Sequence, residues 1–454
     1  MAQISGRTSW RTVFAFGAPA VGAGYMYLLL SLYVMKFATD VLLIAPAVMG
    51  LIFSASRLWD AVSDPLAGYL SDGTRSRLGR RRSWILASLI PVGLTFIMVF
   101  SPPADLEGGA LIAWMAVAII GFYSAMTVFF IPHMSLGAEL TDDYHERTRL
   151  FGMRHAFYTV GSILALVSMT FLINAEMKSE DAVRSVAVWQ SWIAAAVMSG
   201  LILYAVVRLK EREDYQGRGS NGPFQALKDV LANTHARTLY LVWFIENVGS
   251  SAIGALTLYV TAYIVGAPQW APLIILCYMV PSTFGVPAWL ALSRRIGKIK
   301  AWQVSMVGTG LSFGSMVMLL VWDSVEMRLA WIMAMAVLAG FSAAGGGSIG
   351  PSVQSDVIDY DEMRTGQRKE GSYYAAWNFV AKSALGVVLL MTGFALQMAG
   401  FAPNAEQTMA VKSTMILLYA VFPLLLCTGG AFLMSRFKLD EASHQDIRVA
   451  LGRV

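Results

Sequence analysis

Three charged side chains stand inside a stretch of sequence that is otherwise apolar and small. Arg57, Asp60 and Asp64 lie in the segment 56–65, which reads Ser-Arg-Leu-Trp-Asp-Ala-Val-Ser-Asp-Pro. Their spacing of i, i+3 and i+7 places all three on one face of a helix. Two carboxylates on such a face could bind a small cation or a proton, with the arginine balancing part of their charge.

The apolar surroundings make these charges costly. A charge near the centre of a bilayer costs about 2.5–3.5 kcal/mol on insertion scales, so a helix with three charges should turn them toward a bundle interior or a watery cavity. A structural salt bridge is the alternative, in which Arg57 pairs with one carboxylate and holds helices together. That alternative leaves the second carboxylate unexplained, so the pattern predicts an ion or proton site.

Composition places the whole chain in the membrane. Of its 454 residues 56% are hydrophobic and only 14% are charged, against about 25% charged in a typical soluble domain. Cys277 and Cys427 both fall in apolar segments, which favours reduced packing thiols over a disulfide. Basic residues are dispersed among short loops, so nucleic-acid binding is not expected.

Segments long enough to cross a bilayer of about 30 Å number twelve in the sequence. Together they predict an all-α membrane protein. Their approximate limits are 13–37, 44–71, 84–103, 109–138, 150–175, 185–208, 237–266, 270–293, 302–322, 328–357, 372–400 and 408–435.

The basic residues predict the orientation of these spans. Most of the 34 lysines and arginines fall on one side, in the two termini and in alternate loops. Because basic loops stay in the cytoplasm, both termini are expected there. Arg7 and Arg11 precede the first apolar stretch without a small-residue cleavage site, so this stretch is predicted to be the first span and not a removed signal peptide.

The longest polar connection divides the chain into two halves. We expect a six-helix bundle over 1–208, a cytoplasmic middle loop over 209–236, a second six-helix bundle over 237–436 and a cytoplasmic tail over 437–454. The halves look like repeats, since the loop 77–84 (RLGRRRSW) corresponds to 295–302 (RIGKIKAW) and the stretch 143–146 (DYHE) to 359–362 (DYDE). Two parallel six-helix repeats are the organisation of major-facilitator transporters, whose substrate and ion sites lie near the midplane between the halves.

Two regions carry a family resemblance. The stretch 57–65 followed by 72–80 (DGTRSRLGR) resembles the second helix and following loop of the glycoside-pentoside-hexuronide:cation symporter family. The stretch 356–371, running on to Lys382, is similar to the family's tenth-to-eleventh helix region. The resemblance implies the major facilitator fold with twelve transmembrane helices, and symport of a glycoside, uronide or related sugar-like solute by alternating access.

The resemblance also implies roles for single residues. Asp60 and Asp64 fall on the family's cation-binding carboxylates, with Ser63 and Thr127 at positions that help to coordinate the ion. Lys382 falls on a lysine near the cation site, and it would couple the ion to the solute together with Arg57. Hard oxygen ligands suit Na⁺ or Li⁺, and the same carboxylates could instead take a proton.

Two departures from the sugar-specific members bear on the solute. Pro19 and Phe130 stand where galactoside transporters carry sugar-contacting aspartates, so a neutral galactoside is not expected. Phe130 could stack on a pyranose ring, contact an amphiphile such as a lysolipid, or serve only in packing. Cation-coupled transport of an amphiphilic solute such as a lysolipid is therefore the alternative function.

Further residues are candidates to line the substrate cavity or to gate the cytoplasmic side. His133 is expected to be a hydrogen-bonded structural residue, since a lone histidine in a span is more often that than a ligand. Ionic contacts between the basic loops and acids at neighbouring helix ends would latch one conformation. The cavity candidates are Phe130, Tyr123, Arg154, Glu246, Asn247, Trp377 and Asn378, and the gating candidates are Asp72, Arg75, Arg80, Glu139, Arg295 and Asp356.

Other functional classes lack their required residues. An ATP-driven pump needs a phosphate-binding Gly-x-x-x-x-Gly-Lys-Ser/Thr motif, whereas the stretch 345–352 (GGGSIGPS) lacks the lysine and is better explained by close helix packing. A membrane-embedded enzyme needs a nucleophile with its base or a cluster of metal ligands, and the five histidines are scattered. We expect a monomer in a bacterial inner membrane, with a solute and Na⁺ or H⁺ as partners and without a cofactor or resident metal.

Overall fold

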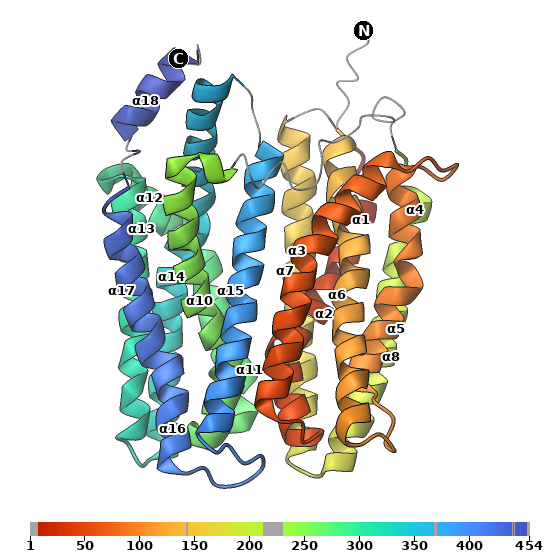
Figure 1. The fold of residues 1–454 in the computed structure, drawn as a ribbon, viewed down its shortest axis with the longest axis vertical. Coiled ribbons are helices and arrows are strands. Elements are labelled where there is room, and N and C mark those ends of the chain that lie inside the picture. Colours follow the sequence, from red (N-terminus) through yellow and green to blue (C-terminus); the bar gives the residue numbers. More distant parts are fainter. Residues whose placement is uncertain are drawn as a thin grey trace. The chain divides into compact units, whose positions relative to one another are not determined.

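The computed structural model of the protein describes residues 8–141, 144–211, 230–366, 370–437, 439 and 441–451. Within these residues the regular elements are all helical. They form two compact units, one of residues 1–44 and 55–223 and one of residues 45–54 and 224–454. Figure 1 shows long helices that run alongside one another within each unit.

The first unit contains the helices that carry the three charges. The helices and the π-helical turn η1 are α1 (Trp10–Gly17), α2 (Pro19–Lys36), η1 (Phe37–Val41), α3 (Pro46–Gly73), α4 (Arg80–Ala87), α5 (Leu89–Phe100), α6 (Gly108–Glu139), α7 (Tyr144–Glu176) and α8 (Glu180–Arg208), with the first turns of α3 assigned to the second unit.

The second unit repeats this pattern of long spans. It also holds a short helix, α18, that follows the last span. Its helices and short helical turns are α10 (Thr234–Val260), η3 (Thr261–Val265), η4 (Pro268–Trp270), α11 (Ala271–Phe284), α12 (Val286–Ile296), α13 (Lys298–Gly314), η5 (Ser315–Leu320), α14 (Val325–Thr365), α15 (Glu370–Met398), α16 (Met409–Ile416), η6 (Leu417–Val421), α17 (Phe422–Met434) and α18 (Glu441–Ala450).

The helices agree with the twelve predicted spans. Ten helices in the described residues are long and apolar enough to cross a membrane, and α11 with α12, which meet at a bend of 47°, make an eleventh if counted as one span. Pro287 explains the bend, because it lacks the N–H that the carbonyl of Thr283 would accept. The twelfth predicted span corresponds to α3. Its 28 residues include the charged side chains of Arg57, Asp60 and Asp64, so α3 is less apolar than the ten helices counted above.

Local sequence signals fix where several helices begin. The side chains of Ser179, Ser324 and Thr408 each accept a hydrogen bond from the backbone N–H three residues later, at the starts of α8, α14 and α16. Such caps satisfy N–H groups that have no acceptor within the helix.

The two matching basic loops have the same backbone turn. Gly79 precedes α4 with φ 106° and ψ 159°, and Gly297 precedes α13 with φ 85° and ψ 154°. This region of conformational space is essentially restricted to glycine. The repeat seen in the sequence is therefore also a repeat of local structure.

Candidate functional site: ionisable residues of the spans

The arginine of α3 pairs with the first of the two carboxylates. Arg57 Nη1 donates to Asp60 Oδ2 at 3.0 Å, and the two side chains are only 5% and 2% exposed. The guanidinium also lies over the ring of Tyr123 on α6, with Cζ 3.3 Å from the ring centroid. Its Nε and Nη2 are buried and have no hydrogen-bond partner in the described part of the chain. One carboxylate and one aromatic face thus hold the buried cation.

The second carboxylate of α3 faces a hydroxyl from α6. Thr127 Oγ1 donates to Asp64 Oδ1 at 2.7 Å. Ser63 is buried beside Asp64 in sequence, and its hydroxyl has no hydrogen-bond partner among the residues that the structure describes. Leaving a buried hydroxyl unsatisfied is unfavourable, so this oxygen is available to a ligand. The set offers hard oxygen atoms, which suit an alkali cation.

One residue near these carboxylates had no signal in the sequence. Tyr27 of α2 interacts electrostatically with Arg57, Asp60 and Asp64. Its ring lies 6.3 Å from that of Tyr123, measured between centroids. A tyrosine inside a span is usually a packing residue, so only the folded structure identifies it as a neighbour of the charges.

Phe130 and Arg154 lie together. The Arg154 guanidinium lies over the Phe130 ring, with Cζ 4.8 Å from the centroid, and its Nε is buried without a hydrogen-bond partner in the described chain. Among the described residues, the ionisable side chains near Arg154 include Tyr158, Tyr27 and His133. No carboxylate in the described residues pairs with it. An arginine in such surroundings can bind an anion.

His133 has a structural role, as predicted. It is fully buried and stacks on Phe16 and Phe129, at centroid distances of 4.6 and 5.0 Å. Its Nε2 lies 3.0 Å from the carbonyl oxygen of Phe16, so it carries the proton and donates it. That carbonyl belongs to the turn in which α1 ends and α2 begins at Pro19.

In the second unit a carboxylate lies among tryptophans. Trp302 Nε1 donates to Glu246 Oε2 at 3.0 Å, and Trp243 stacks on Trp377 with centroids 4.1 Å apart. A side chain added at Gly346 of α14 would lie 2.2 Å from Glu246 Oε1. Gly345, Gly346 and Gly350 therefore allow close packing, as the sequence suggested, whereas a carbon added at Gly347 would have no atom within 4 Å.

The other predicted residues of this unit have varied surroundings. Asn247 donates to the carbonyl of Trp243 at 2.7 Å, Asn378 is exposed, and Lys382 is half-buried on α15. Lys382 belongs to a different unit from Asp60 and Asp64. Its role beside those carboxylates stays a prediction.

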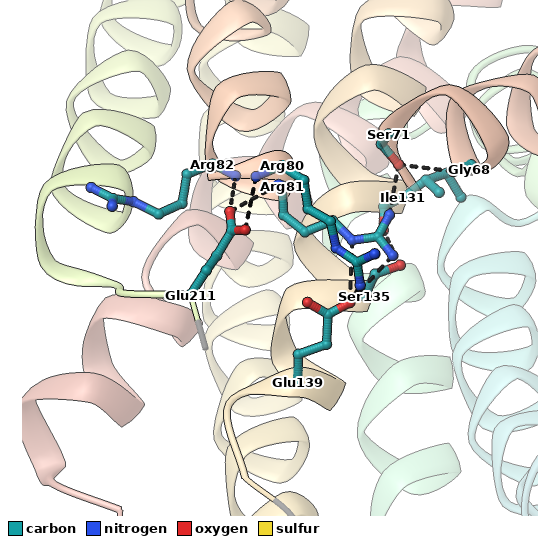
Figure 2. Close-up of polar contacts among 9 residues, drawn as sticks. All are labelled: Gly68, Ser71, Arg80, Arg81, Arg82, Ile131, Ser135, Glu139 and Glu211. Carbon is teal, nitrogen blue, oxygen red and sulfur yellow. Dashed lines mark hydrogen bonds and ion pairs between the residues drawn. The ribbon is translucent and has the colours of Figure 1, made fainter. Parts of the chain in front are cut away.

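The first basic loop is held by a glutamate at the end of α6. Arg80 Nη2 lies 2.8 Å and Arg81 Nη2 3.2 Å from Glu139 Oε1 (Figure 2). Arg81 Nη1 also donates to the hydroxyl of Ser71 at 2.7 Å. Arg81 was not singled out from the sequence, although it belongs to the same basic loop. Arg75 is exposed without an ion pair in the described residues, and the side chain of Asp72 lies outside them.

The second basic loop makes a corresponding contact. Lys298 Nζ donates to both oxygens of Asp356, at 2.9 and 2.7 Å, whereas Arg295 is exposed and has no ion pair in the described chain. His444 of α18 lies 3.1 Å from Asp359 Oδ2 and 3.5 Å from Asp356 Oδ1. Each basic loop thus pairs with an acid at a helix end, Arg80 with Glu139 and Lys298 with Asp356, and a role of these pairs in gating stays a prediction.

Two units of long apolar helices with ionisable side chains buried on a span are the features of a polytopic membrane protein. The fold resembles the crystal structure of the D323A mutant of the nucleoside transporter NupG, with a TM-score of 0.71 over 93% of this chain and 99% of that chain, at 13% sequence identity. The model of the family "MFS/sugar transport protein" matches residues 15–441. The chain belongs to this family, which comprises the glycoside-pentoside-hexuronide:cation symporters, and it is a transporter and not an enzyme.

The names of three similar proteins refer to three different solutes. The chain is 23% identical to the glucuronide carrier protein homolog of Escherichia coli (strain K12), over 92% of this chain and 91% of that protein. It is 25% identical to the isoprimeverose transporter of Lactiplantibacillus pentosus, over 95% and 89%. It is 24% identical to the sodium-dependent lysophosphatidylcholine symporter 1 of Xenopus tropicalis, over 93% and 86%.

Proposed function

We propose that the protein is a cation-coupled symporter whose solute is a sugar derivative that carries a negative charge, such as a uronide. The observation that carries the symport mechanism is the set of oxygen atoms on α3 and α6, supplied by Asp60, Ser63, Asp64 and Thr127. These residues would hold Na⁺ or, at the carboxylates, a proton. Symporter relatives support the coupling cation, whose identity is part of this proposal.

The charge on the solute is inferred from Arg154. In the described residues this cation has an aromatic ring and tyrosines as neighbours and no carboxylate. Phe130 stands where the galactoside transporters carry a sugar-binding aspartate, so that position supplies no carboxylate beside Arg154. A carboxylate on the solute would supply the missing charge, and guanidinium–carboxylate hydrogen bonds are about twice as strong as neutral ones.

The remaining assignments belong to the same proposal. Alternating access would be set by ion and solute occupancy, with Lys382 and Arg57 coupling the two. Glu246, Asn247, Trp377 and Asn378 would contribute to the cavity from the second half, and Tyr123 from the first. We place the protein in the bacterial inner membrane as a monomer, with both termini in the cytoplasm.

Uptake into energised membrane vesicles tests this function. Glucuronides should accumulate when a Na⁺ or H⁺ gradient is imposed, should leave when an ionophore collapses it, and should not respond to ATP. A neutral galactoside of the same size should accumulate far less. Uptake that is independent of both gradients would contradict symport.

A second candidate solute is an amphiphile such as a lysolipid, whose phosphate group could bind Arg154. Its support is the apolar residues Pro19 and Phe130 at the positions of two acids, the contact of Phe130 with Arg154, and the lysophosphatidylcholine symporter among the relatives. Competition decides between the candidates. Lysolipids that block glucuronide uptake without being transported favour the uronide, and gradient-driven transport of the lysolipid itself favours the amphiphile.

A further inference from the structure

A carboxylate from the end of the first half binds the start of α4. Three successive backbone N–H groups donate to Glu211: that of Arg80 to Oε2 at 2.8 Å, and those of Arg81 and Arg82 to Oε1 at 2.8 and 2.6 Å (Figure 2). The first N–H groups of a helix have no acceptor inside it, and the helix dipole favours a negative charge there. Glu211 thus fills an anion site with a side chain of the protein itself.

Gly79 makes this approach possible. A side-chain carbon added to it would lie 2.4 Å from Glu211 Oε1. Its φ of 106° is also a conformation that other residues rarely adopt. Glycine is therefore required at this position for two independent reasons, and one of them is the carboxylate.

A second contact joins the same two segments. Arg82 donates through Nε and Nη2 to the carbonyl of Val206 in the last turn of α8, at 2.9 and 2.6 Å. Carbonyls in the last turn of a helix lack intrahelical donors. Arg82 of α4 thus supplies hydrogen-bond donors to a carbonyl at the end of α8. Glu211, which follows α8 by three residues, supplies acceptors to the N–H groups at the start of α4.

The side chains of the same arginines face the other way. While Glu211 holds the backbone of Arg80 and Arg81, their guanidinium groups reach Glu139 at the end of α6 (Figure 2). Displacement of this backbone would move both arginines relative to Glu139. Glu211 is positioned to determine where they lie.

The second basic loop lacks this arrangement among the described residues. Gly297 has the same backbone conformation as Gly79, but a side-chain carbon added there would have no atom within 4 Å. The loop sequence is repeated in both halves, whereas among the described residues the carboxylate anchor is found in the first half, at the point where the chain leaves it.

We propose that Glu211 is a positioning residue of the cytoplasmic gate. It fixes the chain that leaves α8 to the first basic loop and keeps Arg80 and Arg81 directed at Glu139. This inference relies on the proposed function only in assigning these arginines to a gate. The anchor itself can be tested without transport.

Hydrogen exchange of the purified, full-length protein tests the anchor. In Glu211→Ala and Glu211→Gln the first amides of α4 should exchange about tenfold faster or more, because they lose hydrogen bonds to a charged acceptor. Asp105→Ala, which removes an exposed acid, is the control and should leave this exchange unchanged. Unchanged exchange in both Glu211 variants would overturn the proposal.

A pair of glycine substitutions distinguishes the loss of the Glu211 contact from the effect of backbone strain. Gly79→Ala and Gly297→Ala impose similar strain, but only Gly79→Ala also displaces Glu211. Trypsin should cut after Lys210 faster in Gly79→Ala and in Glu211→Ala than in the wild type and in Gly297→Ala. Equal cleavage in all four proteins would contradict the anchor.

Transport kinetics test the role in gating. Glu211→Gln should lower the maximal uptake rate severalfold while equilibrium binding of cation and solute stays at the wild-type value. A matching loss of binding would show that Glu211 only supports the fold and would refute a positioning role. A wild-type protein that transports none of the solutes tested would refute the proposed function and leave the exchange and cleavage results standing.

Discussion

Replacing Asp60 by asparagine should separate structural pairing from ion coupling on α3. Asp60 and Arg57 form a buried ion pair at 3.0 Å, with both side chains at most 5% exposed. Removing one partner of such a pair leaves an uncompensated buried charge and typically costs about 3–5 kcal/mol. Asp60→Asn should therefore unfold at a clearly lower temperature than the wild type.

Asp64→Asn is the matched comparison on the same helix. The neutral hydroxyl of Thr127 donates to Asp64, and the asparagine carbonyl can still accept that hydrogen bond. Weakening this one hydrogen bond should cost about 1 kcal/mol, less than breaking the buried ion pair of Asp60. Both variants should lose concentrative uptake, because each removes a negative charge from the proposed cation site.

Thermal unfolding of the purified variants can be followed with a thiol-reactive dye, since Cys427 is only 1% exposed and becomes accessible on unfolding. Combining Asp60→Asn with Arg57→Met should recover most of the lost stability, because a buried ion pair can often be replaced by apolar groups at little cost. If Asp60→Asn proves as stable as Asp64→Asn, the buried pair does not hold this region and the reasoning fails.

Three further predictions concern the ion site, the coupling and the topology. Thr127→Val should weaken cation binding about tenfold or more by removing an oxygen and the hydrogen bond to Asp64, whereas Thr127→Ser should not; titration of the purified protein with Na⁺ measures both. Ion and solute should raise each other's affinity by the same factor, typically about 5–150-fold, and Lys382→Ala should reduce that factor more than it reduces either affinity alone. Calorimetric titration of each ligand with and without the other checks this. Equal affinities in all four conditions of the wild type would rule out symport. A cysteine in the exposed turn between α3 and α4, Ser76→Cys, should resist membrane-impermeant reagents added outside intact cells, and labelling there would contradict the predicted topology.

Spacing along one helix was enough to predict that Arg57, Asp60 and Asp64 share a face, but it left open which carboxylate Arg57 pairs with. Residues at i and i+3 of a helix are neighbours whatever the rest of the chain does, so the 3.0 Å contact of Arg57 with Asp60 is within reach once α3 forms. The twelve spans follow for a similar reason, since a long apolar segment in a bilayer must satisfy its backbone hydrogen bonds internally. The repeated loop sequence predicted that the two basic loops correspond, and both contain a glycine turn of the same conformation.

Contacts between helices were decided only by tertiary structure. Thr127 and Asp64 are 63 residues apart, and their hydrogen bond depends on how α6 packs against α3. The family resemblance pointed to Thr127, but no local pattern does so. Tyr27 and the partnership of Phe130 with Arg154 likewise have no signature in the sequence, because aromatic residues in spans mostly serve in packing.

Glu211 illustrates the same limit at the helix ends. In the sequence it is one of several charged residues in a polar connection, and its spacing predicts no partner. Its role arises because the packing of α8 against α4 brings the end of one helix beside the unsatisfied N–H groups of another. The sequence by itself determined which segments are helical and which residues share a helix face, because these depend on neighbours within a few positions. Tertiary packing determined which faces and ends meet, because that depends on the shapes of side chains far apart in the chain.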